Sequence, residues 1–415
     1  MPEPGRAPTY RWVVLAAFMF VNLTIQTLWI SYAPISNRAQ DYYGVSSSAI
    51  GAFAISFMIA FLPISFLASQ AIVRHGLRFA AGFGALLAGV SGVARGLVGD
   101  HYVLALVATL GAAIAQPFLL NAWTTLSTQW FPHSQRATAV SLITLSNLVG
   151  AGIGLALTPT LVEPMSVSGV QLLYGLVALL GGLVFVLVAR DRPATPPDGV
   201  VVATAPELML VGVRHALSVR PFRVFLVMAF VTFGVFNGLS TWIEEIVAPR
   251  GFSSTDAGNT GALMLLGGVA GAMLLSALSD RSGRRVPYLA VALTLSAPAL
   301  LWVALASSLP GLLGAAFLLG FFMTSALPVG MQYSAEITAP TPEGTSNGLI
   351  QLAGQASFVC VLLMAATKTD AGSFTPSLAV LAALILVGGI LAFRLPEPAV
   401  HIGIHDLLAD AGTDP

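Results

Sequence analysis

Long apolar stretches, nearly free of charge, recur along the whole chain. A helix that crosses the roughly 30 Å hydrocarbon core of a bilayer needs about 20 predominantly apolar residues. The sequence contains twelve such stretches: 12–34, 48–70, 79–99, 102–126, 137–161, 169–189, 222–245, 257–279, 286–307, 310–333, 344–366 and 376–394. Only 9% of the 415 residues are charged, whereas about 25% are charged in a soluble domain. We therefore expect an all-α membrane protein with twelve transmembrane helices.

The composition argues against several other classes of protein. The apolar share of 56% is too high for a disordered chain. The 18 basic residues are matched by 18 acidic ones, so no basic excess is present to neutralise nucleic-acid phosphates. The single cysteine, Cys360, excludes an internal disulfide and a thiolate cluster. No Ser/His/Asp or metal-ligand cluster lies at depth, so we expect neither an enzyme nor a bound cofactor or metal.

The basic residues indicate how the chain is oriented in the membrane. If the N-terminus is cytoplasmic, fourteen of the 18 Lys and Arg residues fall on the cytoplasmic side. The other four are Arg38, Arg95, Arg250 and Lys368. The positive-inside rule therefore predicts that both termini are cytoplasmic, and we expect a multi-pass protein of the plasma membrane. Arg95 lies near the outer end of its stretch, from which its side chain could snorkel to the interface.

The predicted spans divide into two sets of six. The longest polar interval, between residues 190 and 221, contains four prolines and reads as a linker. The expected parts are an N-terminal bundle (1–190), a cytoplasmic linker (191–220), a C-terminal bundle (221–394) and a cytoplasmic tail (395–415). A shift of 207 residues places Arg74-His75-Gly76-Leu77-Arg78 on Arg281-Ser282-Gly283-Arg284-Arg285. This layout resembles the major facilitator superfamily, which is built from two parallel six-helix repeats.

The second copy of the repeated loop carries the stronger signature. The run from Ser276 to Arg285 resembles the superfamily pattern Gly-x-x-x-Asp-Arg-x-Gly-Arg-Arg, with Ser276 in the first position. Asp280 could pair with an arginine there and stabilise one conformation. Glu336 and Glu343 are expected to contact inner-face arginines and to favour the outward-open state, although ordinary solvated charge is an equal alternative. The candidate gating residues are Asp280, Arg281, Arg285, Arg78, Arg136, Glu336 and Glu343.

The middle of the predicted spans holds no carboxylate and no histidine. A proton-coupled carrier usually places a titratable group at depth, and an anion carrier is expected to hold a central Lys or Arg. The sequence therefore predicts a neutral site, suited to a zwitterion, a neutral solute or an organic cation held against ring faces. The candidate site residues are polar and aromatic: Trp29, Tyr32, Gln116, Asn121, Asn147, Phe236, Asn237 and Gln355. For any one of them alone, helix–helix packing is the simpler interpretation.

Several segments resemble the feline leukaemia virus subgroup C receptor-related transporters. They are Trp29-Ile30-Ser31-Tyr32 with Ile35-Ser36-Asn37, Tyr43-Gly44-Val45, Gly76-Leu77-Arg78, Ala115-Gln116-Pro117-Phe118, Trp130-Phe131, Asn147 to Gly154, Gly234-Val235-Phe236, and Glu336-Ile337-Thr338 through to Gln355. This branch is associated with choline, ethanolamine and haem. The resemblance implies a choline-type site in which Trp29, Phe236 and Gln355 match the family pattern. Leu148 and Asn237 depart from it, and no axial His or Cys for haem lies in the membrane.

The sequence thus predicts a major facilitator carrier that works by rocking its two halves around a mid-membrane site. The expected substrate is a choline-like amine, a quaternary ammonium ion or a zwitterion, and the expected state is a monomer in the bilayer. A proton-coupled exporter of amphipathic compounds is one alternative, for which Glu244, Glu245 and Glu336 are the only acids available. A non-transporting membrane receptor is another.

Overall fold

The computed structural model describes residues 10–191, 206–341, 343–369 and 372–398, and these residues are helical almost throughout. The helices are α1 (Tyr10–Ile30), η1 (Ala33–Ile35), α2 (Ser36–Tyr43), α3 (Ser47–Leu97), α4 (Tyr102–Leu120), α5 (Ala122–Trp130), α6 (His133–Val188), α7 (Pro206–Ser218), α8 (Arg220–Val247), η2 (Ala248–Arg250), α9 (Ser254–Ser282), α10 (Val286–Leu305), α11 (Leu309–Ile337), α12 (Glu343–Ala356), α13 (Phe358–Ala366) and α14 (Thr375–Ala392). No strand occurs within these ranges.

Ten helices of the described chain are long and apolar enough to cross a membrane. Two of these apolar stretches, 47–97 and 138–188, are 51 residues long. At about 1.5 Å per residue each would extend far beyond one bilayer. Each contains one residue with non-helical backbone angles: Gly76, with φ of 86°, in α3, and Ser166, with φ of 67°, in α6. Both α3 and α6 are therefore pairs of helices joined at a sharp turn, and the predicted spans lie on either side of each turn.

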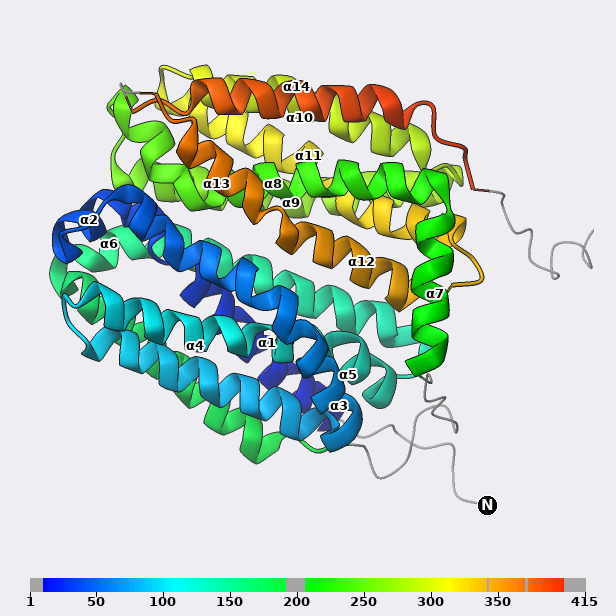
Figure 1. Cartoon of the computed structure of the whole chain (residues 1–415), viewed down its shortest axis with the longest axis horizontal. Coiled ribbons are helices and arrows are strands. Elements are labelled where there is room, and N and C mark those ends of the chain that lie inside the picture. The colour runs from blue at the N-terminus through cyan, green and yellow to red at the C-terminus, as the bar shows by residue number, and fades with distance from the viewer. Residues whose placement is uncertain (1–9, 192–205, 342, 370–371, 399–415) are drawn as a thin grey trace, which may run out of the picture.

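Two groups of helices lie side by side (Figure 1). The N-terminal helices, α1 to α6, pack against one another, and so do the C-terminal helices, α8 to α14. Glycines allow close approach within each group: a Cβ on Gly96 of α3 would lie 2.4 Å from the Cα of Leu172, and a Cβ on Gly271 of α9 would lie 1.8 Å from the carbonyl oxygen of Phe321. Small residues at such contacts are typical of helix packing in membranes.

The elongated molecule has two ends that the helix labels identify (Figure 1). We name the end that carries α2 the α2 end, and the opposite end, where α7 runs across both groups, the α7 end. Helix α7 lies within the predicted linker. The N-terminal and C-terminal helices contact each other at the α2 end.

Two of the predicted spans are each interrupted by a break in the helix. The span predicted at 102–126 breaks at Asn121, four residues after Pro117, and the span predicted at 344–366 breaks at Ser357. The Ser357 hydroxyl donates to the carbonyl oxygen of Gly354 at 2.6 Å, which offers that carbonyl a partner in place of the regular ladder. Broken helices occur in membrane proteins where they are buried or line a cavity. Gln355 lies directly at this second break.

Candidate functional site

Two glutamates of α8 connect the two groups of helices at the α2 end. The Ser36 hydroxyl donates to Oε1 of Glu245 at 2.8 Å, and the backbone N–H of Asn37 donates to Oε2 of Glu244 at 2.8 Å. Both carboxylates are buried, with 2% of Glu244 and 4% of Glu245 exposed. Because Ser36 and Asn37 are the first two residues of α2, these bonds hold the start of α2 against α8.

The two carboxylates have different partners. Lys368 places Nζ 2.8 Å from Oε2 of Glu245. Glu244 instead accepts a short hydrogen bond from the hydroxyl of Ser254, and no cation within the described chain contacts it. A buried charge is tolerated when hydrogen bonds or an opposite charge replace its lost hydration. The contact between the groups therefore depends on partners supplied from both sides.

We expect Lys368→Met to weaken this contact. The substitution keeps most of the apolar stem but leaves the Glu245 carboxylate buried without its cation, which costs about 1–3 kcal/mol. Water can offset part of the cost, because 29% of the Lys368 side chain is exposed. A cysteine introduced at the α2 end should therefore react faster with a thiol reagent in this variant than in the parent protein. Equal labelling rates would show that the ion pair does not hold this contact closed.

Close glycine contacts complete the junction at the α2 end. A Cβ on Gly258 of α9 would lie 2.3 Å from the carbonyl oxygen of Leu155 in α6. A Cβ on Gly51 of α3 would lie 2.1 Å from Cη2 of the Trp242 indole of α8. Each pair joins an N-terminal helix to a C-terminal one, so the two groups are tightly shut at this end.

Towards the α7 end, part of α12 is exposed. Gly344 and Gly348 of α12 have no neighbouring atom within 4 Å of a built Cβ. The helix 344–366 is also the least buried of the ten apolar helices. The structure is therefore closed at the α2 end and exposes α12 towards the α7 end.

Trp29 of α1 and Phe236 of α8 each precede the shut junction by less than ten residues of sequence. Trp29 precedes Ser36 by seven residues, and Phe236 precedes Glu245 by nine. The indole N–H of Trp29 donates to the carbonyl oxygen of Ala54 at 3.3 Å, and 8% of Trp29 is exposed. Phe236 is partly exposed.

The amide of Asn237 links α8 to the broken helix that carries Gln355. Its Nδ2 donates to the carbonyl oxygen of Gly354 at 3.3 Å and to the hydroxyl of Ser357 at 3.1 Å. The partly exposed Gln355 makes no hydrogen bond to any described residue. Asn237 therefore serves as a helix–helix contact, while the neighbouring Gln355 amide remains available to a ligand.

The other candidate side chains fall into two classes. Gln116 and Asn147 are buried, and their carbonyl oxygens Oε1 and Oδ1 have no hydrogen-bond partner within the described residues. Asn121 is already bound to the Ser65 carbonyl at 2.9 Å and to hydroxyls of α3. Tyr32 is 2% exposed, and its hydroxyl is 2.7 Å from that of Tyr43. Tyr32 and Asn121 thus serve the packing of the N-terminal helices in this structure.

The snorkelling expected for Arg95 is wrong. The side chain is only 1% exposed and turns inward, where it bonds α1 and α6. Arg95 lies in the last turn of α3, and its side chain is on the packed face of that helix.

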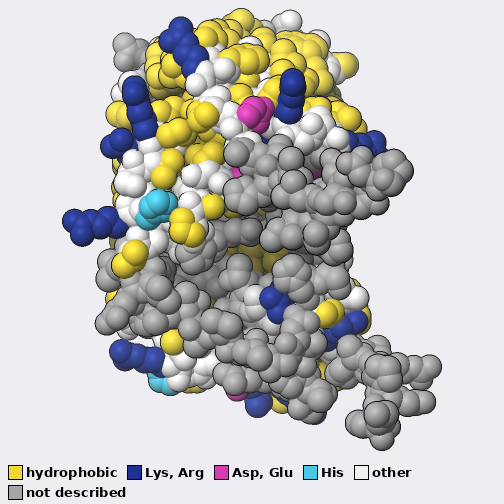
Figure 2. Space-filling model, turned by 90° about the vertical axis from the view of Figure 1, so that its right-hand side faces the viewer, with side chains coloured by type: hydrophobic (Ala, Val, Ile, Leu, Met, Phe, Trp, Pro, Cys, Tyr) yellow, Lys and Arg dark blue, Asp and Glu magenta, His cyan; other side chains and the backbone are white. Residues whose placement is uncertain are grey.

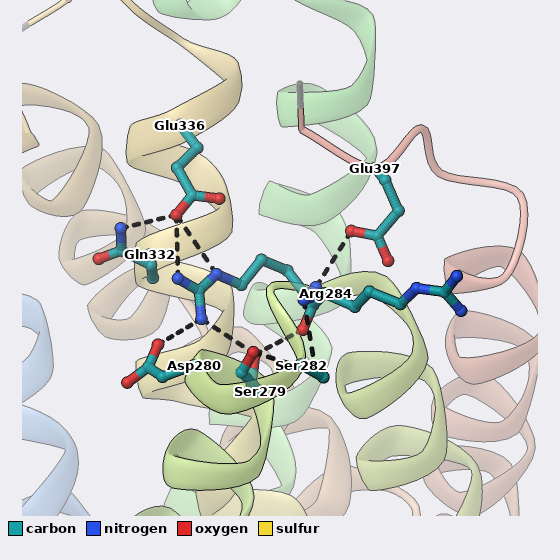
Figure 3. A network of polar contacts seen from close by, with 8 residues as sticks. Ser279, Asp280, Ser282, Arg284, Gln332, Glu336 and Glu397 are labelled. Carbon is teal, nitrogen blue, oxygen red and sulfur yellow. Dashed lines mark hydrogen bonds and ion pairs between the residues drawn. The ribbon is translucent and has the colours of Figure 1, made fainter. Parts of the chain in front are cut away.

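At the α7 end, the repeated loop forms a polar network around Arg285 (Figure 3). Its guanidinium pairs closely with Asp280, and Nη2 lies 3.2 Å from Oε1 of Glu336. Gln332 donates to the same Glu336 oxygen at 2.7 Å. Burial lowers the pKa of Arg285, but the bonds to Asp280 and Glu336 outweigh it, so that the pKa is raised. Asp280 and Glu336 thus both contact Arg285, and all three residues belong to the C-terminal part of the chain.

A pair of acids that the sequence reasoning missed marks the repeat. The backbone N–H of Arg78 donates to Oδ1 of Asp191 at 2.9 Å. At the equivalent loop, the backbone N–H of Arg285 donates to Glu397 at 3.0 Å, and that of Val286 donates to it at 3.1 Å. Each acid follows the last helix of its group and caps the start of another helix, where negative charge is favourable. The sequence signal is slight: Asp191 follows Arg190, and Glu397 follows Pro396, a few residues after helices that end at Val188 and Ala392.

The remaining gating candidates lie outside the network around Arg285. Arg136 donates through Nε to the carbonyl oxygen of Phe131 at 3.3 Å. Arg281 is exposed next to the Asp280 network. The side chain of Glu343, at the start of α12, lies outside the described residues.

Comparison with known proteins identifies the family. The model of the Major Facilitator Superfamily matches residues 13–248 and 243–404. The zebrafish (Danio rerio) solute carrier family 49 member A3 is 31% identical over 371 residues, covering 85% of this chain and 77% of that protein. The human choline/ethanolamine transporter FLVCR2 is 27% identical over 367 residues, covering 83% and 69%.

Solved structures agree with this family assignment at the level of the fold. An inward-facing, unoccupied bacterial homolog of the human lysosomal transporter Spinster superimposes with a TM-score of 0.71 at 15% identity, covering 94% of this chain and 97% of that one. The helical fold, the apolar spans and the relatives agree. The chain therefore belongs to the major facilitator superfamily and is a multi-pass membrane transporter.

Proposed function

We propose that this protein carries a small amine such as choline or ethanolamine across the membrane by alternating access. The observation that carries the proposal is the pair of aromatic side chains, Trp29 of α1 and Phe236 of α8, which come from opposite groups of helices and each precede the shut junction by less than ten residues. A ring face attracts a quaternary ammonium ion without a counter-ion. Relatives named as choline/ethanolamine transporters match this chain at 25–27% identity.

The site would bind the two parts of such a substrate differently. Trp29 and Phe236 would hold the ammonium group, and cation–π contacts are worth about 0.5–2 kcal/mol each, depending on desolvation. The free amide of Gln355 would bind the hydroxyl group. Gln116 and Asn147 offer unpaired carbonyl oxygens that could accept from a hydroxyl, an amine or a bridging water.

The layout we infer has twelve crossings, since α3 and α6 each turn back once and α4–α5 and α12–α13 each form one broken span. The moving halves would be 1–190 and 221–394, joined by the linker 191–220, with the tail 395–415 beyond them. Dark blue Lys and Arg side chains are spread over the described part of the α7 end (Figure 2). By the positive-inside rule this is the cytoplasmic face, and both termini are cytoplasmic in the plasma membrane.

In this orientation, the structure corresponds to a carrier closed to the outside and opening inward. Opening outward would break the bonds from Ser36 and Asn37 to the two glutamates and separate Gly258 from Leu155. The Asp280–Arg285–Glu336 network lies in one half only, so it would set the geometry of the inner loop of that half instead of joining the halves. Rocking of two repeats about a fixed central site is the common mechanism of such carriers.

A binding panel on the purified protein tests this proposal. Choline and ethanolamine should raise the unfolding temperature, because a ligand that binds only the folded state stabilises it by RT ln(1 + [L]/Kd). Glucose is the neutral comparison, glutamate the acidic amino acid and benzoate the anion. At equal concentration none of the three should change the unfolding temperature. Stabilisation confined to the anions would overturn the proposed substrate class.

A further inference from the structure

Arg95 is a buried charge without an acidic partner in the described chain. Its Nη1 donates to the carbonyl oxygen of Leu28 at 3.0 Å, and its Nη2 donates to the Ser31 hydroxyl at 2.9 Å and, by a shorter bond, to Oε1 of Gln171. The guanidinium carbon also lies 4.9 Å from the centre of the Tyr32 ring. The contacts come from α1, α6 and the turn after α1.

The end of α1 supplies the compensating negative charge. Helix α1 stops at Ile30, so the carbonyl oxygens of its last turn have no intrahelical partner and carry partial negative charge. Arg95 binds one of them, that of Leu28, from the side. A ring face, here that of Tyr32, adds a further attraction for the cation.

These contacts compensate only part of the cost of burying the Arg95 charge. A role in helix packing alone would therefore not explain an arginine at this position. Nε of Arg95 and Nε2 of Gln171 are buried donors without a partner within the described residues. Burying a guanidinium costs several kcal/mol before its contacts repay it, and apolar residues of similar volume are often as good or better for stability. Ionisable groups at depth in membrane proteins are commonly functional.

The bonds of Arg95 bracket Trp29. Leu28 immediately precedes Trp29 and Ser31 follows it by two residues, so the guanidinium binds a backbone carbonyl just before the indole and a side-chain hydroxyl just after it. The indole N–H is itself bound by Ala54, which lies in the first part of α3, while Arg95 lies in the second part. The two arms of α3 thus hold the ring and its backbone at separate points.

We propose that Arg95 is a positioning residue that sets the orientation of Trp29 towards the substrate. This inference rests on the proposed function, because it assigns a task to Trp29 that the site requires. Lysine at this position would keep the charge, but its single ammonium group cannot reproduce the planar fork that reaches Leu28, Ser31 and Gln171 together.

The first test needs no ligand. Hydroxyl-radical footprinting with peptide mass spectrometry reports the oxidation rate of Trp29, which is low when the ring is covered. In Arg95→Lys that rate should rise about threefold or more, because local opening exposes the ring. Arg250→Lys is the matched control: Arg250 donates to the carbonyl oxygens of Val303 and Ala306 at 2.7 and 2.9 Å, at the end of α10.

The second test is a double-mutant cycle on the dissociation constant of choline. Arg95→Lys should weaken binding about five- to tenfold in the parent protein, and by less than about twofold when Trp29 is already alanine, because residues that act through one another are not additive. Unchanged Trp29 oxidation, or a full Arg95→Lys effect without Trp29, would overturn the positioning role. If choline does not bind the parent protein, the proposed function fails, while the footprinting result still decides whether Arg95 holds Trp29.

Discussion

Gly258→Ala is expected to leave choline binding intact but to slow transport about tenfold or more, an effect that corresponds to roughly 1.4 kcal/mol. Alanine raises the intrinsic stability of a helix relative to glycine, so the helix itself does not suffer. The added Cβ, however, would lie 2.3 Å from the backbone carbonyl oxygen of Leu155. Because the opposing atom belongs to backbone, α6 and α9 must move apart, and the state closed at the α2 end loses stability.

Cysteine labelling measures this shift directly. Cys360 is the only cysteine, so Ser36→Cys in a Cys360→Ser background gives one probe at the junction between the groups. A membrane-impermeant maleimide should modify this probe faster when Gly258 is alanine. Gly348→Ala is the control, since a Cβ at Gly348 meets no atom within 4 Å. Equal labelling of the two variants would show that closure at the α2 end does not require the close approach of α6 and α9.

Trp29→Ala is expected to raise the dissociation constant of choline about 10- to 30-fold, because a desolvated cation–π contact contributes up to about 2 kcal/mol. Gln355→Ala should have a smaller effect, about fivefold, typical of one lost hydrogen bond. Trp302→Ala provides the control, because Trp302 is a tryptophan of α10 with 45% of its surface exposed. Isothermal titration with choline gives all three values.

The unfolding temperature separates lost contacts from lost structure in this series. The indole of Trp29 makes one hydrogen bond, to Ala54, so some loss of stability is expected on truncation. If Trp29→Ala and Gln355→Ala bind choline as well as Trp302→Ala does, the substrate site lies elsewhere, whatever their stability.

Much of the architecture was predictable because bilayer thickness sets the length of a spanning helix. Both turns, at Gly76 and Ser166, fall in the short gaps between predicted spans. The pairing of Asp280 with Arg285 was also predictable, because the two residues are five positions apart in a loop pattern that occurs in both halves of the chain. Such features depend on local sequence and on polarity along the chain.

What could not be predicted depends on which face of each helix turns inward. In a membrane protein the lipid-facing side is as apolar as the core, so helical periodicity does not distinguish them. For this reason Arg95 was expected to snorkel but is buried, and Tyr32 was grouped with the site but packs near Tyr43. The Glu244–Glu245 junction also escaped prediction, because it requires α2 to fold against α8, a contact between residues about 200 positions apart.

Uptake of radiolabelled choline into liposomes that contain only this protein tests the central claim most directly. We predict saturable uptake that unlabelled choline and ethanolamine inhibit, that benzoate does not inhibit, and that Trp29→Ala reduces about tenfold or more at low substrate concentration. The claim would be contradicted if uptake were no greater than in protein-free liposomes and if choline and ethanolamine also failed to stabilise the same protein preparation.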